Sequence, residues 1–110
     1  MKRPPNLTRK LVLEDPQRSP DGAGGYTEAW VALGTLWAEV NPLSGRLNGD
    51  SLSLQKYRIT LRASPDGFAS RPRPDQRFRD GNRLYRIDAV AESEPAGRYL
   101  TCFAVEEVST

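Results

Sequence analysis

The alternation of apolar and polar residues is clearest in residues 56–62, which read KYRITLR. Tyr57, Ile59 and Leu61 occupy every second position, so their side chains share one face of an extended chain. A period of two residues is typical of a strand with one face against a core and the other toward solvent. The chain is therefore expected to build its core on a half-buried sheet.

Similar patterns precede this segment. Residues 26–40, YTEAWVALGTLWAEV, predict two strands or one long bent strand, with a turn or bulge at Gly34, because glycine inside a strand pattern often marks such an irregularity. Residues 8–15, TRKLVLED, predict a short strand that ends before Pro16. Both segments favour extended structure in the first half of the chain.

A closing pair of strands is predicted in the second half. Residues 83–91, RLYRIDAVA, and 98–107, RYLTCFAVEE, are separated by the turn-like SEPAG. Roughly six short strands with frequent turn signals predict an all-β fold, either a small antiparallel β-barrel or a sandwich. At 110 residues the chain is expected to form one domain over 1–110.

Three segments do not fit strands. They are the N-terminal residues 1–6, expected to be a flexible arm, the turn-like PDGAGG at 20–25, and the long stretch 42–55. A hairpin connection usually spans about two to five residues. The stretch 42–55 is therefore predicted to be one long projecting loop, either with a function of its own or as plain surface.

Composition excludes several classes of function. The sequence contains no histidine, which removes the commonest general base and the imidazole metal ligand. The acidic residues form no recognisable catalytic motif, so no enzyme activity, metal or cofactor is expected. Cys102 lies in the apolar run YLTCFAV and is expected to pack in a strand. No apolar run is long enough for a membrane span, and a cytoplasmic, membrane-free protein is expected.

Basic residues concentrate in the middle of the chain. Residues 56–86 hold nine basic and three acidic side chains, a net +6, whereas residues 87–110 hold one basic and five acidic, a net −4. Such a patch can contact phosphates or an acidic protein neighbour, or it can be a solvated region with intramolecular partners. The candidate contact residues are Arg71, Arg73, Arg77 and Arg79.

An ordered set of residues resembles a known family. Its first half comprises Asp21, Gly24, Gly25, Trp30, Trp37, Ala38, Val40, Pro42 and Gly45. Its second half comprises Ile59, Leu61, Arg62, Arg77, Phe78, Gly81, Tyr85 and Ile87. In order and spacing this set resembles the phage head-tail joining, or head-closure (stopper), family. The chain departs from that pattern at Gly45-Arg46-Leu47, where the family often carries a glutamate soon after the glycine.

The resemblance implies a structural role in the virion neck of a tailed phage or phage-like particle assembled in the bacterial cytoplasm. It implies a six-fold or twelve-fold homo-oligomeric ring between the portal or adaptor proteins and the tail terminator or tail tube. Double-stranded DNA would pass through the channel of that ring. The long loop would then point into the channel and help to retain the DNA, with these residues at its tip: Ser44, Gly45, Arg46, Leu47, Asn48, Gly49 and Asp50.

Aromatic residues are expected in the core or between subunits, because large aromatics dominate both environments. They are Trp30, Trp37, Tyr57 and Tyr85. Residues 98–107 are apolar on both faces, so a second cover is expected, either a neighbouring subunit or a second sheet of the same domain.

Two other functions stay open from the sequence. The first is the tail terminator or adaptor ring of the same neck. The second is an OB-like domain that binds single-stranded nucleic acid, which would also be a small barrel with basic and aromatic residues. The position of Tyr57 on the apolar side of its strand speaks against an OB platform.

Overall fold

The computed structural model describes residues 4–43, 55–64, 70–92 and 97–107. Six strands lie within these ranges: β1 (Arg9–Pro20), β2 (Tyr26–Leu43), β3 (Lys56–Arg62), β4 (Arg77–Asp80), β5 (Arg83–Glu92) and β6 (Tyr99–Glu107). The described residues contain no helix long and apolar enough to cross a membrane. The fold is all-β, which confirms the expectation from the alternating pattern.

The strands form one antiparallel sheet that closes on itself in the order β1-β2-β3-β6-β5-β4. Every neighbouring pair is antiparallel, and β4 completes the closure by pairing with both β1 and β5. Inward side chains from all six strands fill the interior, including Leu11, Ile59 and Phe78, each without exposed surface. Cys102 is fully buried among them, which confirms its expected packing role.

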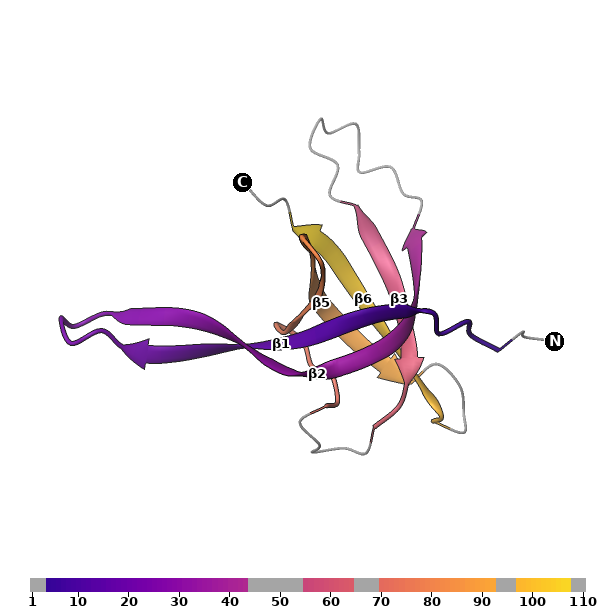
Figure 1. The fold of residues 1–110 in the computed structure, drawn as a ribbon, viewed down its shortest axis with the longest axis horizontal. Coiled ribbons are helices and arrows are strands. Elements are labelled where there is room, and N and C mark those ends of the chain that lie inside the picture. Colours follow the sequence, from indigo (N-terminus) through magenta and orange to yellow (C-terminus); the bar gives the residue numbers. More distant parts are fainter. Residues whose placement is uncertain (1–3, 44–54, 65–69, 93–96, 108–110) are drawn as a thin grey trace.

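A long hairpin leaves this barrel (Figure 1). β1 pairs with β4 only through residues 12–14, and β2 pairs with β3 only from Ala38 onward. Between these points the two strands pair only with each other, out to the Pro20–Tyr26 pair. Figure 1 shows the resulting two-stranded ribbon extending well away from the barrel. The ribbon has no further strand beside it, because β4 pairs with β1, and β3 with β2, only within the barrel.

An irregularity near Gly34 separates the ribbon from the barrel. Leu13 faces Gly34, but Glu14 faces Ala32, so Leu33 is an extra residue on β2. Such a bulge bends the strand and increases its twist. Of the two alternatives expected for residues 26–40, the structure has one long strand, and its bulge is at Leu33, next to the expected position Gly34. The bulge lies where the ribbon leaves the barrel.

Three sequence-based expectations require correction. β1 does not end before Pro16 but continues to Pro20. Proline is accepted there because β1 has no second neighbour at that point, so no ladder hydrogen bond is lost. The short strand β4 was not predicted, since RFRD has no clear alternation of its own. Pro42, assigned to the long loop, lies in β2 opposite Tyr57.

The hairpin turn has a specific local cause. Asp21 Oδ1 accepts hydrogen bonds from the backbone N–H groups of Ala23 (2.8 Å) and Gly25 (3.0 Å). Gly22 and Gly24 both have positive φ, 82° and 87°, which glycine adopts without steric cost. The amides also lower the pKa of Asp21 below its ordinary value, so the turn keeps its negative charge.

Candidate functional site

One end of the barrel collects the chain segments that flank residues 44–54. β2 ends there at Leu43, β3 begins there at Lys56, and β6 ends there. Gln55 Nε2 donates to the carbonyl oxygens of Leu43 (3.1 Å) and Lys56 (3.0 Å). Gln55 in turn accepts a hydrogen bond from the backbone N–H of Glu106 (3.0 Å). Leu43 and Gln55 are thereby tied to each other and to β6.

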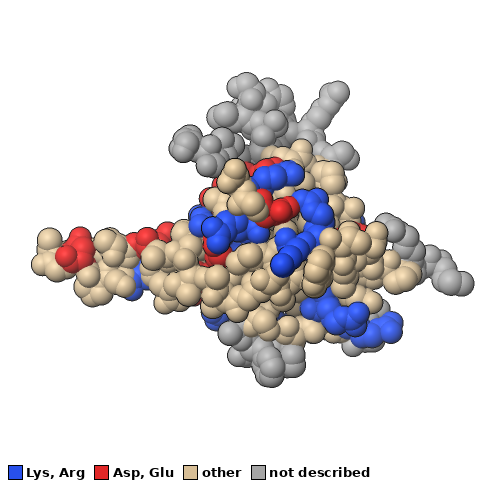
Figure 2. Space-filling view, viewed as in Figure 1, with Lys and Arg blue, Asp and Glu red and all other residues tan. Residues whose placement is uncertain are grey.

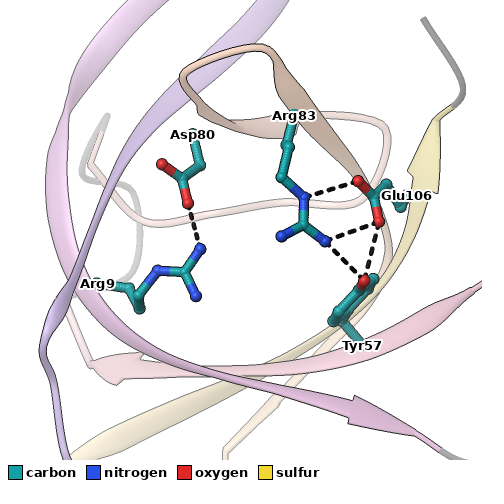
Figure 3. A network of polar contacts seen from close by, with 5 residues as sticks. All are labelled: Arg9, Tyr57, Asp80, Arg83 and Glu106. Carbon is teal, nitrogen blue, oxygen red and sulfur yellow. Dashed lines mark hydrogen bonds and ion pairs between the residues drawn. The ribbon is translucent and has the colours of Figure 1, made fainter.

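A polar cluster lies beside this base (Figure 3). Arg83 Nε donates to Glu106 Oε2 (2.8 Å), and Arg83 Nη2 donates to Glu106 Oε1 (3.0 Å) and to the hydroxyl of Tyr57 (2.8 Å). The Tyr57 hydroxyl donates to Glu106 Oε1 (2.9 Å). The three side chains come from β5, β6 and β3, so the cluster joins three strands at the same end.

Mutual contact shifts the pKa values of this cluster. Hydrogen bonds from Arg83 hold the pKa of Glu106 below its ordinary value. The bond to Glu106 raises the pKa of Arg83, whereas desolvation followed by the bond to Glu106 raises the pKa of Tyr57. Glu106 and Arg83 are therefore charged, and Tyr57 protonated, at neutral pH.

Two further contacts extend the cluster. The ring of Tyr85 meets that of Tyr57 edge to face, with centroids 5.0 Å apart and planes at 79°. Tyr85 has no exposed surface, and its hydroxyl has no hydrogen-bond partner among the described residues. Arg9 pairs with Asp80 across the same end (Figure 3). Tyr57 and Tyr85 thus lie in the core, below a charged barrel end.

A second charged cluster lies where the ribbon leaves the barrel. Glu14 is only 3% exposed and is held by Arg77 Nε (2.7 Å) and Arg79 Nη2 (3.0 Å). The guanidinium of Arg77 lies over the ring of Trp30, 4.0 Å from its centroid. Arg77 and Trp30 therefore brace the base of the ribbon, and the charge of Arg77 is compensated within the chain.

The other two candidate contact arginines also have local partners. Arg71 Nη1 donates to the carbonyl of Ser64 (2.8 Å). Arg73 is largely exposed and lies 3.9 Å from Asp15 Oδ1. The structure thus brings Arg73, Arg77 and Arg79 to the acidic residues 14–15 of β1. A role of these arginines toward phosphate or a partner stays a prediction.

The outer face of β3 and β6 carries basic and aromatic side chains, in contrast to the charged clusters described above. Lys56, Arg58 and Arg62 point outward from β3 and form no ion pair with any described residue. Phe103 faces Arg58 and is 37% exposed, while Arg62 lies over the ring of Tyr99 at 5.9 Å. The outward side chains of β6 are therefore not fully covered by the described part of the chain.

Trp37 joins this face from β2. It is 55% exposed and lies one residue beyond the Ala38–Leu61 pair, next to Arg62 in register. Trp37 is thus a surface residue of the isolated chain. The predicted channel-loop residues, 44–50, lie outside the described residues.

Sequence reasoning missed the two carboxylates that organise these clusters. In the sequence Glu14 and Glu106 each stand beside a second acidic residue, Asp15 and Glu107, and belong to no catalytic motif. Each instead lies within an alternating strand, next to apolar neighbours. That position was the available signal, because a charged residue there is either exposed or paired.

Solved structures contain this barrel. A chain in the virion of a native gene transfer agent particle is 50% identical, with a TM-score of 0.81, and the match covers 97% of this chain and 100% of that one. Protein SF1141 from Shigella flexneri 2a is 21% identical over 94% of this chain and 96% of its own, with a TM-score of 0.69, and shares the fold. No curated protein sequence matches.

The fold, together with the 50% identity to a chain of a virion, identifies this chain as a virion structural protein. A family model described as phage head completion protein matches residues 2–107. The chain belongs to the phage head completion protein family, which confirms the family resemblance noted from the sequence.

Proposed function

We propose that this protein is the ring-forming head-closure subunit of the neck of a phage-like particle. Copies of the chain would form a ring between the portal or adaptor and the tail, around the DNA channel. Family membership and the 50% identity to a chain of a gene transfer agent virion support the particle and the structural role. The ring and its neighbours are the proposal.

The observation that carries the channel role is the fixed base of residues 44–54. Gln55 bridges Leu43 and β6, and the Tyr57–Arg83–Glu106 cluster joins three strands beside it. A segment held at both ends by a rigid barrel can be placed reproducibly in every copy of a ring. Gly45 and Gly49 would permit the backbone rearrangement that opening for DNA ejection requires.

Truncation of the loop tests this role. Replacing residues 46–53 with a short Gly-Ser link keeps Leu43, Gln55 and the polar cluster, so the barrel should fold normally. The expected result is assembled heads that contain this protein but do not retain their genome. Packaged DNA protected from nuclease is the measurement, and unchanged thermal unfolding of the purified variant is the control.

Particles that contain the truncated chain and still hold DNA would contradict the channel role. Residues 44–54 found on the outer wall of the ring would contradict it as well. A reconstruction of the neck also separates head closure from the alternatives, since an adaptor contacts the portal directly and a tail terminator contacts the tail tube.

A further inference from the structure

The two-stranded ribbon that extends beyond the barrel takes no part in the functional roles proposed above. This ribbon, called the arm from this point on and distinct from the N-terminal residues 1–6, comprises residues 15–31, from the Asp15–Val31 pair to the turn at residues 21–25. Its strands pair only with each other. A two-stranded hairpin alone is marginally stable in water, so an arm of this length is expected to gain stability from a partner.

The arm is acidic and carries exposed apolar side chains. Asp15, Asp21 and Glu28 outnumber Arg18, for a net charge of −2. Arg18 Nε lies 3.9 Å from Glu28 Oε2 on the same ribbon face, so the excess negative charge lies at Asp15 and Asp21. Tyr26 is 69% exposed and Val31 is 44% exposed. Tyr26 shares one ribbon face with Glu28, because the two residues are two positions apart in a strand.

A complementary surface lies on the barrel. The basic face comprises the outward positions of the adjoining β2, β3 and β6, among them Trp37, Lys56, Arg58, Arg62, Tyr99 and Phe103. Glu39 and Glu107 also lie at outward positions, so three basic and two acidic side chains give this face a net charge of +1. Its three lysine and arginine chains have no ion-pair partner among the described residues. Figure 2 shows acidic side chains along the arm, and basic side chains with acidic ones among them over the barrel.

The two surfaces account for all the exposed large hydrophobic side chains in the described part of the chain. Tyr26 and Val31 lie on opposite faces of the arm, and Trp37 and Phe103 lie on the basic face. Aromatic and arginine side chains are enriched in protein interfaces, and opposite charges favour and orient the encounter. The arm and the face therefore suit each other better than either suits a second copy of itself.

We propose that the arm of one copy packs across the basic face of the next copy, with Tyr26 near Phe103 and Glu28 near Arg58. The contact joins two different surfaces of the same chain, so it is heterologous, and such contacts form rings when the rotation closes. This inference rests on the ring proposed above and names its interface. Pro16 and Pro20 remove donors from the β1 edge, which favours side-chain packing over strand addition.

Cysteine pairs test the contact in assembled particles. Tyr26→Cys with Phe103→Cys should give a ladder of covalent multimers under mild oxidation, because every interface then holds one pair. The native Cys102 is buried and its pKa is raised to about 12 by desolvation, so it should not interfere. Thr27→Cys with Phe103→Cys is the matched control, since Thr27 points to the opposite face of the ribbon.

A charge exchange gives an independent measurement. Glu28→Arg alone, or Arg58→Glu alone, should reduce incorporation into particles by about tenfold or more, because each places like charges together at every interface. The double variant should recover most of the incorporation, since the exchanged pair is again opposite in charge. Failure of the double variant to recover, with folding intact, would overturn the pairing.

The remaining outcomes separate this inference from the proposed function. A ring in the particle without a cysteine ladder overturns the arm contact and leaves head closure standing. Particles without a ring overturn both. Salt-sensitive binding of single-stranded DNA by the purified chain, lost in the Arg58→Glu variant, would assign the basic face to nucleic acid and reject the arm as its occupant.

Discussion

At the residue scale, Glu14 is the one charged residue in the described part of the chain that is buried. It is buried between Arg77 and Arg79 at the base of the arm, and Arg77 also contacts Trp30. Glu14 accepts a hydrogen bond from Arg77 and forms an ion pair with Arg79. Removing one partner of a buried ion pair is strongly destabilising, because the other charge stays buried without compensation. Glu14 therefore holds the junction between arm and barrel.

Replacing Glu14 with Ala should lower the free energy of unfolding by about 3 kcal/mol, because Arg77 is left half-desolvated without its partner. Urea denaturation of the purified chain measures this loss. Glu28→Ala is the matched control, since the Arg18–Glu28 pair is 3.9 Å apart and exposed, and its loss should stay within about 0.5 kcal/mol. Equal losses in both variants would refute the assigned role.

Glu106 should make stability depend on acid pH. Its folded pKa is lowered from 4.5 by Arg83, so its contribution is complete above the unfolded pKa and disappears as pH falls through the folded pKa. Because the pair is partly exposed, we expect Glu106→Gln to cost about 0.5–1 kcal/mol at pH 7. The difference from the natural chain should shrink steadily below pH 4.5. A constant difference across that range would contradict the assignment.

At the scale of elements, the bulge at Leu33 lets one strand serve two structures. After Leu33, β2 belongs to the barrel and pairs with β1 and, from Ala38 onward, with β3. Before Leu33, β2 pairs only with β1 and forms half of the arm. The core residues all lie in the barrel. The arm should consequently be dispensable for folding and required for assembly.

Shortening the arm tests that division. Gln17 faces Ala29, so replacing residues 18–28 with Asn-Gly should give a two-residue hairpin turn with the correct twist. The free energy of unfolding should change by less than about 1 kcal/mol, because no core residue is removed. Incorporation into particles should be lost. Normal particles with the short arm would show that the arm has no part in assembly.

At the scale of the whole molecule, the barrel end that holds Gln55 and the arm would serve different tasks in the proposed ring. The arm would set the contact between copies, and the barrel end would carry residues 44–54. A reconstruction of the particle neck without imposed symmetry should then show a closed six-fold or twelve-fold ring of this chain. A single copy, or a cluster off the axis, would exclude the ring.

The sequence alone determined the class of the fold, several strands and the inward face of the core. Alternation in residues 56–62 places Tyr57, Ile59 and Leu61 inside, as observed, because side-chain direction in a strand depends only on position along it. The apolar setting of Cys102 predicted its burial for the same reason. An ordered set of residues was also enough to indicate the family.

Only the tertiary structure decided which strands pair and which part of β1 and β2 stands free. Alternation identifies faces but not neighbours, so closure through β4 and the ribbon of the arm were not predictable from it. Arg77 and Glu14 are 63 residues apart, and only barrel closure makes them partners. A charge that looks exposed in a strand pattern can thus be buried by a residue from a distant strand.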